Sequence, residues 1–480
     1  MGGISYMGTE SINPAARKFV FTVMITSTLG GLLFGYDTGV VNGALPYMAQ
    51  PDQLNLTPQL EGFVVSALLV GAAIGSVTGG RIADALGRRK MILALALIFF
   101  AAALGCTLAP SVYVMIPCRF VLGLAVGGAS VTVPVYLAEV APADRRGRMV
   151  TQNELMIVSG QFLAYLCNAV LGVMFDGTGH VWRYMLFMAT LPAIFLFFGM
   201  LRMPESPRWM ALKGHVGDAL ATLKKLRGDE KSAVAELSEI QDSIASEAAI
   251  KQFGWSDLMR PWVRRILFIG IGVAVATRFT GVNTIMFYGT QILTEAGFGQ
   301  QIALIANVAN GLTSVLATFA GIWLLGKIGR TTMFKTGILG TMGSLLVIAL
   351  SAMYMAGSPA LPFIVLSMTV VFLAFMQGCI GPVLWLIIAE IFPLQLRGVG
   401  MGICIFCLWI VDAMVGTAFP VVLAEFGLSA AFFVFVVALM IAFLFVHTCV
   451  PETKGKSLEE IEAYFRGNEK KTPDTQAVNI

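Results

Sequence analysis

The chain has 480 residues, of which 57% are hydrophobic and only 12% are charged, and its mean hydropathy is +0.80. Soluble domains are about 45–50% apolar and about 25% charged, so this composition indicates a polytopic membrane protein. It excludes a secreted disulfide scaffold, a disordered chain and a nucleic-acid-binding protein, and the net charge of +4 matters less than where the charges lie.

Apolar runs long enough to cross a bilayer recur along the whole chain. A spanning helix needs about 20 apolar residues, and charged or Gly-, Pro- and Asn-rich breaks separate the runs. Several runs are longer than a bilayer requires, which predicts tilted or kinked helices. Twelve spans are predicted, at residues 19–46, 61–83, 90–109, 111–138, 152–174, 182–201, 262–294, 300–325, 332–356, 359–389, 398–424 and 427–450.

The basic residues predict how these spans are oriented. All but three of the 32 Lys and Arg fall in the two tails or around the connections 2–3, 4–5, 6–7, 8–9 and 10–11. Because Lys and Arg are retained on the cytoplasmic side, both termini are expected to be cytoplasmic. The exceptions are Arg183 at an outer edge, and Arg119 and Arg278 inside spans.

The charges also divide the chain into segments. Within the charged linker, Val216–Leu226 and Ala233–Ala248 have the pattern of short amphipathic helices on the cytoplasmic face. The 7 Cys lie in apolar stretches and the 3 His are scattered, so neither a disulfide framework nor a metal site is expected. The predicted organisation is a cytoplasmic tail (1–18), a six-helix bundle (19–201), the linker (202–261), a second six-helix bundle (262–450) and a cytoplasmic tail (451–480).

An internal repeat relates the two predicted bundles. Residues 136–142 with Arg146-Gly147 match residues 387–393 with Arg397-Gly398 at a constant offset of 251, and the segment at 204–207 is echoed at 451–453. Such repeats are typical of transporters in which the substrate binds near the membrane midplane, between the repeats. The sequence therefore predicts two parallel six-helix halves with a site between them.

The same motifs resemble those of the sugar porter family of the major facilitator superfamily, and the likeness covers nearly the whole chain. It implies an all-α fold of 12 transmembrane helices, in a monomeric multi-pass protein of a bacterial cytoplasmic membrane. It also implies proton-coupled symport of a polyol or monosaccharide, with myo-inositol favoured. The matching segments are residues 80–89, 204–209, 281–283 with Tyr288, and 451–455; residues 35–44, 153–158 and 357–362 are most similar to bacterial myo-inositol–proton symporters.

Two charged residues within the first bundle are candidates for proton coupling. Asp37 lies among glycines in the first span, and Arg119 opens the fourth. A charge at the bilayer centre costs several kcal/mol, so each is a functional candidate. The resemblance implies that Asp37 accepts and releases the proton while Arg119 tunes its proton affinity, with no other cofactor. The alternative is a permanent ion pair that only joins two helices.

Charged residues near the cytoplasmic ends form the predicted gate. The resemblance implies salt bridges between helices that lock the outward-open state and break as the halves rock, whereas the alternative is a solvated loop that obeys the positive-inside rule. Gly326 stands where the family pattern has an acid, which predicts a weaker lock in the second half. The gate residues are Arg81, Asp84, Arg88, Glu139, Arg146, Glu390 and Arg397.

The substrate pocket needs amide and acid groups for hydroxyls and aromatic faces for ring CH groups. For a single Trp in a span, the alternative is core packing or an interfacial position. Trp385 follows a helix-breaking Gly381-Pro382 pair, which favours the pocket. The pocket residues implied by the resemblance are Gln161, Asn283, Tyr288, Trp385 and Trp409.

Polar residues at three sites, one of them a pair, depart from the family pattern. Thr277 and Arg278 replace paired glutamines, Glu154 replaces a glutamine, and Asp412 replaces an asparagine. We hypothesise that Arg278 and Asp412 form an ion pair across the cavity, which leaves the site near neutral for an uncharged polyol. In the alternative, Arg278 binds a substrate carboxylate and the substrate is a sugar acid.

Two other classes of protein fit the sequence less well. A non-transporting nutrient sensor could use the same fold, but such sensors usually have long cytoplasmic extensions, whereas the C-terminal tail here is residues 451–480. An enzyme is not expected, because no set of nucleophile and base is present.

Overall fold

The computed structural model describes residues 14–142, 146–175, 177–249, 260–456, 460–461 and 465. These residues are helical, with no strand among them, as expected from the hydropathy. The first half comprises α1 (Pro14–Met48), α2 (Pro58–Leu86), α3 (Arg88–Leu108), α4 (Val112–Val140), α5 (Arg146–Met174), α6 (Val181–Met188) and α7 (Thr190–Leu201).

The second half contains two spans with interrupted helices. It comprises α11 (Pro261–Arg278), α12 (Val282–Glu295), α13 (Gln300–Leu325), α14 (Arg330–Tyr354), α15 (Leu361–Phe375), the π-helix η2 (Met376–Ile380), α16 (Gly381–Ile391) and α17 (Leu394–Cys449). α11 and α12 form the apolar segment Pro261–Glu295, and α15, η2 and α16 form Leu361–Ile391. The Gly381-Pro382 pair begins α16 directly after the π-helical turn, so it alters the helix there without ending the span.

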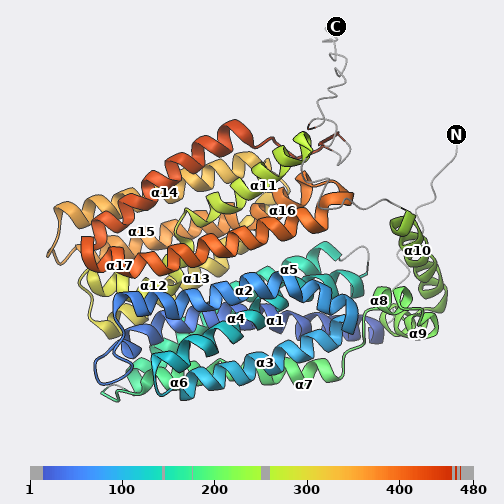
Figure 1. Ribbon diagram of the computed structural model, residues 1–480, viewed down its shortest axis with the longest axis horizontal. Coiled ribbons are helices and arrows are strands. Elements are labelled where there is room, and N and C mark those ends of the chain that lie inside the picture. Colours follow the sequence, from blue (N-terminus) through green and yellow to red (C-terminus); the bar gives the residue numbers. More distant parts are fainter. Residues whose placement is uncertain are drawn as a thin grey trace, which may run out of the picture.

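Eleven helices among the described residues are long and apolar enough to cross a membrane. The last of them, Leu396–Cys449, has 54 residues and would be about 81 Å long if straight, whereas the hydrocarbon core is about 30 Å thick. Gly427 breaks it with φ 78° and ψ 176°, a conformation open to glycine, and the chain turns back there (Figure 1). This segment therefore supplies two of the twelve predicted spans.

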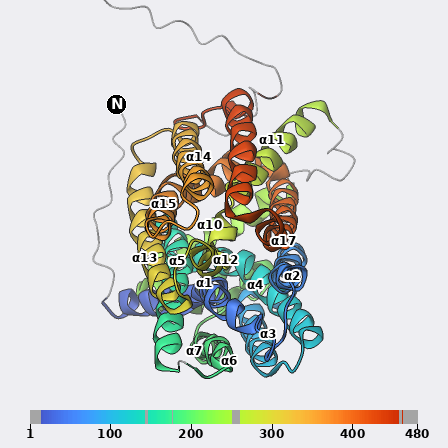
Figure 2. The same cartoon turned by 90° about the vertical axis from the view of Figure 1, so that its left-hand side faces the viewer.

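The helices form two bundles that lie side by side (Figures 1 and 2). The linker helices α8 (Pro207–Leu212), α9 (Val216–Arg227) and α10 (Glu230–Ala249) lie at one end of the first bundle. From the distribution of Lys and Arg we expect this end to face the cytoplasm, and we call it the inner end and the opposite one the outer end. α8 was missed in the sequence because six residues are too few to show helical periodicity.

Small residues set the distance between α2 and α4. A Cβ atom at Gly71 would lie 2.2 Å from the carbonyl oxygen of Phe120, and one at Gly75 would lie 2.3 Å from that of Leu124. Only glycine permits this approach of the two backbones, as in other membrane helix pairs with small residues four apart. Gly71 and Gly75 thus belong to a packing face of this span.

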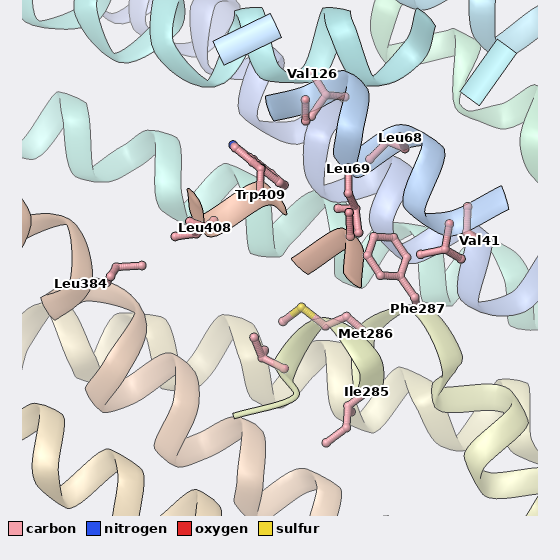
Figure 3. Close-up of a cluster of buried hydrophobic side chains, with 14 of the residues drawn as sticks. Val41, Leu68, Leu69, Val126, Ile285, Met286, Phe287, Leu384, Leu408 and Trp409 are labelled. Carbon is pink, nitrogen blue, oxygen red and sulfur yellow. The ribbon is translucent and has the colours of Figure 1, made fainter. Parts of the chain in front are cut away.

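The two halves meet along a continuous apolar core. α2 packs against α17, α5 against α13 and α1 against α12. Figure 3 shows this junction, where Val41 of α1 and Leu69 of α2 lie near Phe287 of α12. Polar side chains within this core are the candidates for function, because burying them costs free energy unless they are paired.

Candidate functional site

Asp37 and Arg119 form a buried ion pair within the first half. Arg119 Nη1 lies 2.7 Å from Asp37 Oδ1, and the two side chains are 1% and 2% exposed. Arg119 Nε also donates to the carbonyl oxygen of Val64 at 3.3 Å. Asp37 Oδ2 and Arg119 Nη2 have no hydrogen-bond partner among the described residues. The predicted proximity is confirmed, while the role of the pair in proton coupling stays a prediction.

A second charged cluster lies in the second half. Arg278 Nη1 is 3.5 Å from Asp412 Oδ2, and the Asn283 amide donates a hydrogen bond to the same carboxylate oxygen. The hypothesised ion pair is therefore present. It joins α11 to α17, both of the second half.

The remaining pocket residues differ in how accessible they are. Gln161 is buried, Glu154 is half-buried, and the Trp385 side chain in α16 is exposed. Trp409 of α17 is buried against Phe34 of α1, with ring centroids 5.7 Å apart, and its indole Nε1 has no partner among the described residues. Trp409 thus places a buried donor at the junction of the two halves.

Tyr288 departs from the expected pocket role in this conformation. Its side chain is only 1% exposed, its hydroxyl donates to the carbonyl oxygen of Gly416 at 2.7 Å, and its ring packs on Phe419. Because the hydroxyl is already paired and the ring is enclosed, Tyr288 joins α12 to α17 here and is not open to a ligand.

A polar contact closes the outer part of the junction between the halves. Asn42 of α1 accepts hydrogen bonds from Thr290 of α12, from its backbone nitrogen at 3.0 Å and its hydroxyl at 2.5 Å. The Asn42 amide donates to the carbonyl oxygen of Met286 at 2.8 Å. On the same helix, Gln291 Nε2 lies 3.3 Å from the buried carboxyl of Glu61 in α2.

These outer contacts were not identified from the sequence. Asn42 lies in the span-one segment that carries the family resemblance, and a lone asparagine in an apolar span was the available signal, since a buried amide needs partners. Its partners are more than 240 positions away in the chain, and no periodicity relates residues so far apart.

At the inner end, an acid and an arginine pair in each half. Arg88 makes a two-pronged contact with Glu139, at 3.0 and 3.1 Å, and it also lies 2.8 Å from Asp84. In the second half Arg330 is 3.4 Å from Glu390. The second contact is longer and lacks a counterpart of Asp84, in keeping with the weaker lock predicted there.

Both inner pairs join helices of a single half, so rocking of the halves does not require them to break. That these bridges break during transport stays a prediction. Arg81 is exposed. Arg397 is half-buried and its Nε has no hydrogen-bond partner among the described residues. Arg146 begins α5, but its side chain lies outside the described part.

The repeated Pro-Glu segments have the same structural task in both halves. Glu205 accepts a hydrogen bond from the backbone nitrogen of Arg89, at the start of α3, at 2.9 Å. Glu452 accepts from the backbone nitrogens of Arg330 and Thr331, at the start of α14, at 2.8 and 3.1 Å. A carboxylate at a helix N-terminus satisfies free N–H groups and complements the helix dipole.

Comparisons with known proteins agree with this architecture. A family model described as sugar (and other) transporter matches residues 23–465. The Bacillus subtilis major myo-inositol transporter IolT is 60% identical over 449 residues, covering 94% of this chain and 95% of that protein.

Solved structures of the Escherichia coli xylose transporter XylE share the fold. The inward-open form is 28% identical and covers 93% of this chain and 100% of its own, with a TM-score of 0.81. The form bound to 6-bromo-6-deoxy-D-glucose, described as a major facilitator proton:xylose symporter, is 28% identical. It covers 94% of this chain and 99% of its own, with a TM-score of 0.75.

The likeness is thus greater to the inward-open form, as expected for a molecule whose outer contacts are closed. The family model spans nearly all of the twelve-span region, and the relatives align over almost their full lengths. The chain therefore belongs to the sugar transporter family of the major facilitator superfamily, and it is a multi-pass protein of the cytoplasmic membrane.

Proposed function

We propose that the protein is a proton-coupled symporter that carries a polyol or monosaccharide, with myo-inositol favoured, into the cell by alternating access. The observation that carries the proposal is the buried Asp37–Arg119 pair at 2.7 Å. Sequence identity of 60% to a myo-inositol transporter supports the substrate class, and likeness to a proton:xylose symporter supports coupling to protons.

The proton is the coupling ion and no further cofactor is needed. Asp37 is enclosed by helices of the first half, with one carboxylate oxygen paired to Arg119 and the other unpaired. The free energy of protonation of such a carboxylate depends on its distance from the cation and on its contact with water. A conformational change that alters either quantity therefore loads or releases a proton.

The structure corresponds to one state of the transport cycle. Its outer end is closed by Asn42 and its neighbours, so a substrate in the central site would exchange with the inner side. Opening the outer end requires these hydrogen bonds to break, while the inner pairs within each half remain. The protein is expected to complete this cycle as a monomer, with the lipid bilayer as its only other partner.

The test is uptake of radiolabelled myo-inositol by proteoliposomes that contain the purified protein. An imposed pH gradient, acid outside, should drive accumulation above the external concentration. A protonophore should abolish accumulation and leave equilibration. Uptake that reaches the same level with and without the gradient would contradict symport, and lack of any myo-inositol uptake would contradict the favoured substrate.

A further inference from the structure

The carboxylate of Asp412 ties together the two sides of the break in the seventh span. Arg278 is the last residue of α11 and Asn283 is the second residue of α12. Between them the chain leaves the helix, with Gly281 at φ 75°. Asp412 in α17 contacts both Arg278 and Asn283 through one oxygen, so this single side chain fixes how the interrupted helix presents its polar groups.

The chemistry of these groups determines which way the Asn283 amide faces. An ionised carboxylate has only acceptor atoms, so Asn283 must turn its NH₂ group toward Asp412. The amide oxygen is then directed to the other side as an acceptor. An asparagine at position 412, as in the family pattern, would offer both donor and acceptor and would leave either orientation open.

Asp412 also controls the charge at this place. Arg278 is 13% exposed and Asp412 is 2% exposed, so little solvent screens the pair. When both are ionised, Arg278 and Asp412 together carry no net charge. A substrate anion therefore meets no excess of positive charge.

One donor of the cluster is left over. Arg278 Nε is buried and has no hydrogen-bond partner among the described residues. A buried donor without a partner raises the free energy of the folded state, and a substrate hydroxyl would lower it. The cluster thus offers a donor from Arg278 and an acceptor from Asn283, the two kinds of group that hydroxyls of an uncharged polyol bind.

We propose that Asp412 is the positioning residue that makes this site select uncharged polyols over sugar acids, by orienting Asn283 and cancelling the charge of Arg278. This inference rests on the proposed function. Removing the negative charge at 412 frees both the arginine charge and the amide orientation. The variant site should then bind a substrate carboxylate, as in the alternative in which Arg278 binds a sugar acid.

The experiment compares wild-type protein with Asp412→Asn, Asp412→Glu and the double variant Arg278→Gln/Asp412→Asn in proteoliposomes. Exchange of radiolabelled myo-inositol is measured without a pH gradient, with unlabelled myo-inositol or glucuronate as competitor. Exposed Glu425 lies on the same helix, so Glu425→Gln is the matched control for loss of one negative charge from α17.

We expect glucuronate to inhibit Asp412→Asn but neither the wild type nor Glu425→Gln. The KM of Asp412→Asn for myo-inositol should rise about tenfold or more, since one partner of a buried charge pair is lost. Asp412→Glu should keep the wild-type preference. The double variant should lose inhibition by glucuronate and recover part of the KM, which a merely structural role of Asp412 would not produce.

Two outcomes separate failure of this inference from failure of the proposed function. Absence of myo-inositol exchange in the wild type would overturn the proposed function. Wild-type exchange that glucuronate inhibits as strongly as unlabelled myo-inositol would overturn the role of Asp412, even if Asp412→Asn fails to fold. Folded Asp412→Asn that stays insensitive to glucuronate would also overturn it.

Discussion

Replacing Asp37 by asparagine should separate transport from proton coupling. Asparagine keeps the shape of the side chain and can still accept a hydrogen bond from Arg119, but it cannot carry the proton. We expect Asp37→Asn to lose accumulation driven by a pH gradient while it still exchanges labelled for unlabelled substrate. The substitution also leaves Arg119, whose side chain is only 1% exposed, without a counter-charge.

The cost of that lone charge can be worked from the geometry. At the observed separation of 2.7 Å and an effective dielectric constant of about 20, the Coulomb attraction is about 6 kcal/mol. Without Asp37, nothing offsets the free energy lost when the Arg119 charge is removed from water. Breaking a buried pair in this way costs about 3–5 kcal/mol of stability. The other partner of Arg119, the carbonyl oxygen of Val64 at 3.3 Å, does not replace the lost charge.

Two measurements test this reasoning. Thermal unfolding of the purified protein should show a marked decrease in midpoint for Asp37→Asn and partial recovery in Asp37→Asn/Arg119→Gln. Glu230→Gln is the control, because its pair with Lys224 at 2.5 Å is largely exposed and such pairs contribute about 0–1 kcal/mol. Gradient-driven accumulation by folded Asp37→Asn would refute the coupling role, and an unchanged midpoint would refute the energetic argument.

Three further predictions concern the packing and the closed outer end. Gly35→Ala would place a Cβ atom 1.7 Å from a backbone oxygen of α5 and should abolish folded protein in size-exclusion chromatography, whereas Gly343→Ala meets no atom within 4 Å and should fold. Asn42→Ala removes hydrogen bonds to α12 worth about 1 kcal/mol each, which should favour opening of the outer end. Distances between spin labels at the outer ends of the two halves should then lengthen. Unchanged distances would show that Asn42 does not hold the outer end closed. Glu139→Gln weakens the contact with Arg88 by about 1.5–3 kcal/mol and should lower the unfolding midpoint without abolishing substrate exchange. Loss of exchange in folded protein would contradict the proposal that this pair remains intact while the outer end opens.

Span number and the twofold plan could be derived from the sequence because the bilayer acts on each segment separately. A spanning helix must be apolar over its whole length, and basic residues gather on one side of the membrane. The same rule singled out Arg119 and Arg278, since each lies where a charge is costly. The interruption of α17 at Gly427 agrees with two of the predicted spans.

The pairing of the polar groups depended on the tertiary structure. Glu139 of α4 contacts Arg88 of α3. The Asp412 carboxylate contacts Arg278, which lies more than 130 positions earlier in the chain. Such contacts are set by the rotation and depth of each helix in its bundle. An error of a few residues in the ends of a predicted span turns a side chain toward a different neighbour.

The sequence by itself therefore determined the class of protein, the number of spans and the charged residues that demand an explanation. Hydropathy and charge are local properties, and the membrane sorts them segment by segment. Only the tertiary structure decided that the Asp412 carboxylate contacts both Arg278 and Asn283, that Tyr288 is enclosed, and that Asn42 closes the outer end. These facts depend on which helix faces meet, and residues far apart in the chain determine that together.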